Sequence, residues 1–158
     1  MPTWTTFFSA ELSAAATLTG LLFVAVSINL TRILQFAHLP ARAAEALLAI
    51  VSVLFVASFG LIPGQSVHAL AVEIGITGVV VWILQTVLLA RSRKHERQFV
   101  ALRARFVINQ LPPIPFILSG VLLATNHLNG MYWTVPGVLL SLVCGIFEAW
   151  ILLVEILR

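Results

Sequence analysis

Carboxylates are scarce in this sequence, which has six glutamates and no aspartate among its 158 residues. Glu148 lies deep in an apolar stretch, about 15 residues after Trp133, or roughly 22 Å along a helix. An ionised carboxylate that faces lipid there costs on the order of 2.5 kcal/mol or more, so we expect Glu148 to be protonated, paired or in contact with water. Two interpretations stay open: a structural ion pair with Arg32, with Arg42 as the alternative partner, or a carboxylate that handles protons or cations.

Asn29 and Arg32 end the first apolar stretch. A helix of about 20 residues from Leu12 brings the chain to Arg32 at a membrane surface, where a guanidinium can reach lipid phosphates. Both an anchoring role and a functional pairing inside the protein fit this pattern. Glu11 precedes Asn29 by 18 residues, five full turns, so the two lie on one helix face. That face is typical of a pore lining between several copies, and also of packing against other helices.

The segment INQLPPIPF (Ile108 to Phe116) places three prolines inside another apolar stretch. Because proline has no N–H, a continuous helix would leave carbonyls unpaired that lipid cannot satisfy. One interpretation is a helix break covered by protein or lining a wet cavity, with Asn109 and Gln110 as polar partners. The other is a helix that begins at Pro112 or Pro113, with the residues before it at the membrane surface.

Histidines raise the question of a metal site. His68 and His127 are expected at the ends of two helices on one side of the membrane, close to Glu73, and such a set can bind zinc or, through two facing histidines, haem. No spacing motif supports either group, so we predict no metal and no cofactor. The chain also has no HExxH, phosphate-binding loop or nucleophile elbow, and its one cysteine, Cys144, lies in an apolar run. We therefore do not expect an enzyme.

The composition explains where these groups must lie. The chain is 60% hydrophobic and 9% charged, whereas roughly 25% of a soluble domain is charged. A membrane-spanning helix needs roughly 20 mostly apolar residues. We predict a single all-α domain, 1–158, that is a polytopic bundle of five transmembrane helices, at about 10–33, 43–63, 68–90, 106–126 and 132–157. Glu45 and Glu155 then lie at or beyond one membrane surface.

Every lysine and arginine falls on one side of this arrangement. Arg32 and Arg42 flank the first connection and Arg158 ends the chain. The basic loop 91–105 holds the remaining six, Arg91, Arg93, Lys94, Arg97, Arg103 and Arg105. The positive-inside rule predicts an N-terminus outside and a C-terminus inside, with Trp4 and Tyr132 at the outer interface. The loop, as an amphipathic helix or a solvated segment, is expected to bind anionic lipid of the inner leaflet, and nucleic acid is not an expected partner.

Small residues mark two faces suited to close helix packing. Ser13, Thr17 and Gly20 follow helical spacing on the first helix, and the fifth helix repeats Gly137, Ser141 and Gly145. The pattern predicts helix contact and self-association, but both contacts within one chain and contacts between copies remain open.

Three stretches of the first half, AAATLTGLLFVAVSINLTRIL (Ala14 to Leu34), LPARAAEALL (Leu39 to Leu48) and LIPGQS (Leu61 to Ser66), resemble a group of small uncharacterised bacterial multi-pass membrane proteins. Some members of that group are labelled modulators of a membrane-bound AAA protease. The resemblance implies a bacterial inner membrane location and assigns no role to any residue.

Our leading hypothesis is a homo-oligomeric channel or transport-type protein, which requires Asn29 and Glu148 to face water. The alternative is an accessory subunit of a larger membrane complex, which requires these groups to be sealed in pairs and the ridge of Gly137, Ser141 and Gly145 to be exposed. A haem- or metal-binding membrane protein is the third hypothesis.

Overall fold

Helices make up the secondary structure of the chain wherever it is described, and no strand occurs there. The structure, a computed structural model, describes residues 2–36, 38–92, 106 and 108–157. Its elements are α1 (Pro2–Ile28), α2 (Leu30–Gln35), α3 (Leu39–Gly60), α4 (Val67–Ser92), α6 (Pro113–Ala124), the 3₁₀ helix η1 (Leu128–Trp133) and α7 (Thr134–Leu157).

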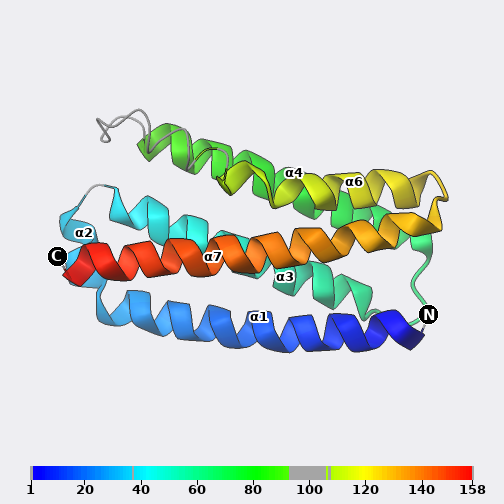
Figure 1. The fold of residues 1–158 in the computed structure, drawn as a ribbon, viewed down its shortest axis with the longest axis horizontal. Coiled ribbons are helices and arrows are strands. Elements are labelled where there is room, and N and C mark those ends of the chain that lie inside the picture. The colour runs from blue at the N-terminus through cyan, green and yellow to red at the C-terminus, as the bar shows by residue number, and fades with distance from the viewer. Residues whose placement is uncertain (1, 37, 93–105, 107, 158) are drawn as a thin grey trace.

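The long helices lie side by side in three layers, with α3 and α7 between α1 on one side and α4 and α6 on the other (Figure 1). The two chain termini lie at opposite ends of the bundle. We call the end with the start of α1, the α3–α4 turn and η1 the N-terminal end. The end with α2, the start of α3 and the end of α7 is the C-terminal end.

Four helices are long and apolar enough to cross a membrane: Trp4–Ile28, Leu39–Gly60, Val67–Arg91 and Asn129–Ile156. The fifth apolar helix, Ile108–Ala124, is shorter. The prediction of an all-α protein with apolar, membrane-length helices is therefore confirmed in this coarser form.

The first helix differs from its predicted range, 10–33. It begins at Pro2 and ends at Ile28, and Asn29 separates it from α2. The Asn29 Nδ2 donates a hydrogen bond of 2.9 Å to the carbonyl of Ala25, four residues earlier. Asparagine side chains compete with the backbone for such carbonyls, which makes them poor residues for a helix interior. The polar residue that we expected near the end of one helix is thus the point where the helix is interrupted.

The proline segment combines parts of both interpretations. Residues 108–110 are helical, 111 and 112 form a turn, and α6 begins at Pro113. The residues before the turn are buried in protein, not at a surface, since Asn109 is only 2% exposed. Pro112 cannot donate to the carbonyl of Ile108, and the Cys144 thiol lies 3.5 Å from that oxygen and donates to it instead. Protein therefore covers the break at the Ile108 carbonyl, whereas Leu111 in the turn is exposed.

The core consists of two apolar clusters. The larger one contains Phe8, Ile50 and Phe116 among its members, and the smaller one, at the C-terminal end, contains Ile33, Leu39 and Leu152. Along α3 the smaller cluster ends at Ala43 and the larger begins at Ala46, so residues between them lie where the apolar core is interrupted.

Candidate functional site

Buried polar side chains from four segments occupy the interruption in the core. We call them the polar layer: Arg42 and Glu45 on α3, Gln85 on α4, Asn109 and Gln110 before α6, and Glu148 on α7. Each of the six is less than a tenth exposed. Buried polar and charged groups are costly unless they are hydrogen-bonded or paired, so the contacts within the layer decide what it can do.

Arg42 connects the interior to the C-terminal end. Its Nη1 lies 3.9 Å from Glu148 Oε2 and 3.6 Å from Glu155 Oε1. Glu155 in turn has its Oε2 3.5 Å from His38 Nε2, and the Glu155 side chain is a third exposed. We call these four groups, Glu148, Arg42, Glu155 and His38, the ladder. It runs from a carboxylate that is 3% exposed to an accessible histidine. Glu148 is thus paired with Arg42, and the expected Glu148–Arg32 pair is wrong.

Arg32 has a different contact. Its Nη1 donates a hydrogen bond of 2.7 Å to the carbonyl of Ile156, in the last turn of α7. The last four carbonyls of a helix have no partner within the helix, and a cation near them is favoured by the helix dipole. Arg32 therefore caps α7 and ties α2 to it.

Glu45 and Asn109 meet inside the bundle. The Asn109 Nδ2 donates to Glu45 Oε2 at 2.9 Å, and Glu45 is 1% exposed. Glu45 is therefore part of the interior of the bundle. The sequence places it by depth, at or beyond a membrane surface, and does not indicate this burial, which follows from its position on α3 facing Asn109.

Gln110 bonds to α4. Its Nε2 donates to Thr86 Oγ1 at 3.0 Å, and the Thr86 hydroxyl donates its own proton to the carbonyl of Trp82 at 2.7 Å. Because that proton is committed, Thr86 can only accept from Gln110, which fixes the orientation of the Gln110 amide. The Oε1 of Gln110 and that of Gln85 are both buried, and neither has a hydrogen-bond partner among the described residues.

The stripe that contains Glu11 and Asn29 faces its own bundle. Leu22, which lies on the same face, is buried in the larger cluster, and Leu18 packs against it. Glu11 is half-buried, and the Asn29 amide is bonded to its own helix. A pore lined by this stripe between copies therefore does not fit the arrangement of α1.

The ridge on α7 packs within the chain. A Cβ added to Gly137 would lie 2.6 Å from the Phe116 ring, and one added to Gly145 would lie 2.6 Å from Ile50. Ser141, between them, is buried. In contrast, a Cβ at Gly20 would meet nothing within 4 Å, so the small-residue face of α1 is the open one.

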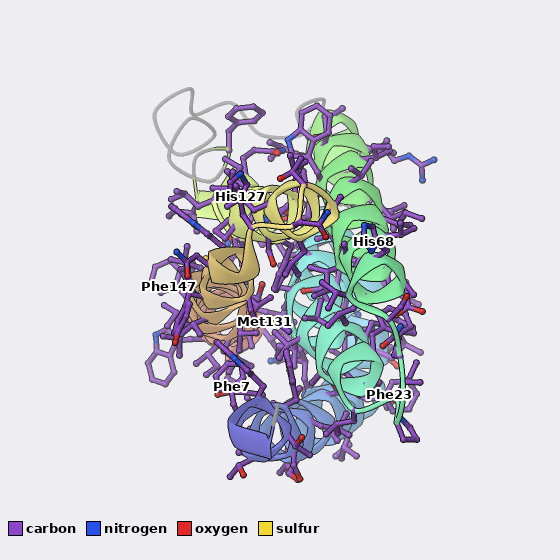
Figure 2. All side chains as sticks on the ribbon, turned by 90° about the vertical axis from the view of Figure 1, so that its right-hand side faces the viewer. Phe7, Phe23, His68, His127, Met131 and Phe147 are labelled. Atoms are coloured by element: carbon purple, nitrogen blue, oxygen red, sulfur yellow. The ribbon has the colours of Figure 1, made fainter. Side chains whose placement is uncertain are left out.

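The three metal-ligand candidates at the N-terminal end do not form a site. His68 and His127 are exposed and belong to different segments, one on α4 and one after α6 (Figure 2). Glu73 accepts a hydrogen bond from Gln65 Nε2. Within the part of the chain that the structure describes, no group of three His, Cys, Asp or Glu side chains is placed to hold a metal ion.

Of the residues predicted to bind anionic lipid, Arg91 is described, and it is exposed near the end of α4. Arg93, Lys94, Arg97, Arg103 and Arg105 lie outside the described residues.

The sequence patterns do not single out two members of the polar layer, Glu45 and Gln85. A signal exists for each: Glu45 follows Arg42 by three residues, which places both on one helix face, and Gln85 is an amide within the apolar stretch 74–90.

Comparisons of the chain with known protein families, with curated proteins and with solved structures found no match.

Proposed function

We propose that this chain is a transport-type protein of the bacterial inner membrane, in which the polar layer takes up protons or small cations from the inner side. The supporting observation is the Arg42–Glu148 pair between apolar helices. Glu148 is buried and does not itself face water as our leading hypothesis required, but Arg42 links it to the partly exposed Glu155. Ionisable groups at membrane depth are costly, and they mark ion pathways and proton relays.

The proposed topology has five spans, with α6 as the short fourth one, the N-terminal end outside and the C-terminal end inside. Charge supports this orientation, since Arg32, Arg42 and Arg91 all lie near the C-terminal end. Aromatic rings at the opposite end of the bundle also support this orientation, since Trp4 and Tyr132 contact each other at the N-terminal end, with ring centroids 5.1 Å apart. Such rings prefer the interface of a membrane.

The ladder offers a route from the inner surface to the layer. Glu148 lies nine residues before the end of α7 at Leu157, or roughly 13 Å along the helix axis. Glu155 and His38 span the distance to the C-terminal end, and both are partly exposed. An ion or proton entering there, beside the smaller apolar cluster, meets Glu155 first and Glu148 farther inside.

The proposed path lies inside each chain rather than on an axis between copies. The polar groups that come together do so between α3, α4, α7 and the segment before α6. Self-association remains part of the proposal, but transport does not depend on it.

The test is reconstitution of the purified protein into liposomes, with fluorescent reporters of internal pH and of sodium. We expect ion movement above that of empty liposomes, and a large reduction in Glu148→Gln. Glu73→Gln is the matched control, because it changes a carboxylate at the N-terminal end that is bonded to Gln65. Flux equal to that of empty liposomes, or unchanged flux in Glu148→Gln, would contradict the proposal.

A second candidate is an accessory subunit of a larger membrane complex. The α7 ridge that it was expected to expose packs inside the chain, and the open face of α1 takes its place as the supporting observation. Ser13 and Thr17 are exposed there, and their hydroxyls donate to the carbonyls of their own helix, which leaves a smooth face around Gly20. Small residues of this kind let membrane helices approach closely. Native mass spectrometry from mild detergent tests it: a stoichiometric complex with another protein that Gly20→Leu disrupts would support this function.

A further inference from the structure

Two buried amide oxygens in the polar layer lack donors. Gln85 is 1% exposed and Gln110 is 8% exposed, and the Oε1 of each has no hydrogen-bond partner among the described residues. For Gln110 a flipped amide does not remove the problem, because Thr86 has already given its proton to Trp82. Buried polar atoms without a protein partner are normally satisfied by internal water.

These oxygens are linked to Glu45 through consecutive residues and two hydrogen bonds. Glu45 accepts from Asn109, whose neighbour Gln110 donates to Thr86, and Thr86 is the neighbour of Gln85. Hydrogen bonds and chain neighbours thus connect Glu45, Asn109, Gln110 and Thr86 between α3, α4 and the segment before α6, and Gln85 is buried next to Thr86 on α4.

We propose that Gln85 and Gln110 hold water beside Glu45, and that the species passed through the polar layer is a proton. This inference rests on the proposed transport function and names its substrate. Two amide oxygens and a carboxylate suffice to order water, which makes about three hydrogen bonds at a buried site. They fall short of the roughly six oxygen ligands that a hard metal cation takes.

The step is a simple proton transfer. A hydronium ion delivered along the water gives one proton to a carboxylate oxygen of Glu45: one O–H bond breaks in the hydronium, one forms on the carboxyl group, and neutral water remains. Release is the reverse reaction, in which the carboxyl group of Glu45 returns its proton to a neighbouring water. No electron is transferred, and no further reactant is needed.

Proteoliposomes test the substrate. An outward potassium gradient with valinomycin sets the membrane potential, and we expect a pH-sensitive dye inside the vesicles to report proton entry. Under the same conditions we expect no uptake of radioactive sodium. The double variant Gln85→Leu/Gln110→Leu removes the acceptors of the water that delivers the proton. It should slow proton entry by roughly a hundredfold, the lower end of what a positioned proton-transfer group or water chain contributes. Gln35→Leu, which changes an exposed amide at the C-terminal end, should leave it unchanged. Sodium uptake without proton entry in the unmodified protein would overturn the inference and leave the transport function standing.

Infrared spectroscopy tests the water independently of flux. We expect the unmodified protein in lipid films to show O–H stretching bands that shift in oxygen-isotope-labelled water, and the double variant to lack them. Identical bands in the two proteins would overturn the inference. Water bands that disappear as expected, together with an absence of any flux, would overturn the transport function and leave the hydrated site standing. Matching circular dichroism spectra are required of every variant that is compared.

Discussion

Arg42 holds two carboxylates of α7 at different depths. Glu148 is buried, whereas Glu155 is partly exposed, and the guanidinium lies within 4 Å of both. A guanidinium offers several N–H donors in a fixed fork, which suits it to serve two acceptors at once. Breaking a buried ion pair by removing one member is more damaging than replacing both members with apolar residues, since the second change leaves no charge behind.

Arg42→Leu should therefore lower the free energy of unfolding by roughly 3–5 kcal/mol. Arg32→Leu should cost less, because that side chain caps a helix end at an exposed position. Chemical denaturation in detergent micelles, followed by circular dichroism, measures both. The double variant Arg42→Leu/Glu148→Leu should recover part of the loss, and a double variant that is less stable than Arg42→Leu would rule out this pairing.

Cys144 has a structural role at the residue scale, as the donor to the Ile108 carbonyl that Pro112 cannot serve. Cys144→Ala should destabilise the protein by about 1–3 kcal/mol, the usual cost of a buried group left unsatisfied. Cys144→Ser keeps a donor and should cost less. Thermal unfolding of the two variants side by side is the measurement, and equal melting temperatures would show that the thiol does not satisfy the carbonyl.

At the scale of elements, glycines allow the backbones of α4 and α6 to come into close contact where the two helices cross. A Cβ added to Gly120 would lie 2.6 Å from the Cα of Gly75 and 2.8 Å from the carbonyl oxygen of Ala71. Both neighbours are backbone atoms, which cannot rotate away. This crossing positions the segment that carries Asn109 and Gln110 against α4.

Gly120→Ala should accordingly destabilise the protein by roughly 1–3 kcal/mol through overpacking. The same substitution at Gly20 has the opposite expectation, because that position is open and alanine is favoured over glycine in a helix by about 1 kcal/mol. Unfolding in detergent compares the two. A stability loss of similar size in both variants would contradict the assignment of the loss in Gly120→Ala to the crossing of α4 and α6.

At the scale of the whole molecule, the ladder and the Trp4–Tyr132 ring contact lie toward opposite ends of the bundle. The ladder of His38, Glu155 and Arg42 lies toward the C-terminal end, and the Trp4–Tyr132 contact lies at the N-terminal end. We expect a molecule with this polarity to take the proposed orientation in a membrane with anionic lipid on the inner side.

The orientation can be measured by cysteine labelling in a Cys144→Ser background. His127→Cys, at the N-terminal end, should react with a membrane-impermeant maleimide in intact cells. Gln35→Cys, exposed at the C-terminal end, should react only after the membrane is permeabilised. The reverse pattern would invert the proposed topology, and labelling of both sites in intact cells would mean that the helices between them do not separate two compartments.

Local chemistry along the chain is enough to predict part of this protein. The apolar stretches predict the long helices, because each span's length and composition are properties of consecutive residues. The Pro63–Gly64 pair predicts the turn between α3 and α4, and Gly64 has the positive φ, 71°, that glycine tolerates. The depth of Glu148 in the fifth helix excludes an unpaired charge that faces lipid, and the side chain is buried and paired with Arg42.

Only the tertiary structure decided which groups meet. Arg32 and Arg42 are both candidates for Glu148 by depth, and the rotation of each helix about its own axis selects Arg42. The same rotation turns the ridge of Gly137 and Gly145 inward and leaves Gly20 open. Helix rotation and register depend on packing between segments far apart in the chain, such as α3 against α7. Consecutive residues carry no direct record of that packing, so the polar layer could be recognised only once the helices were assembled.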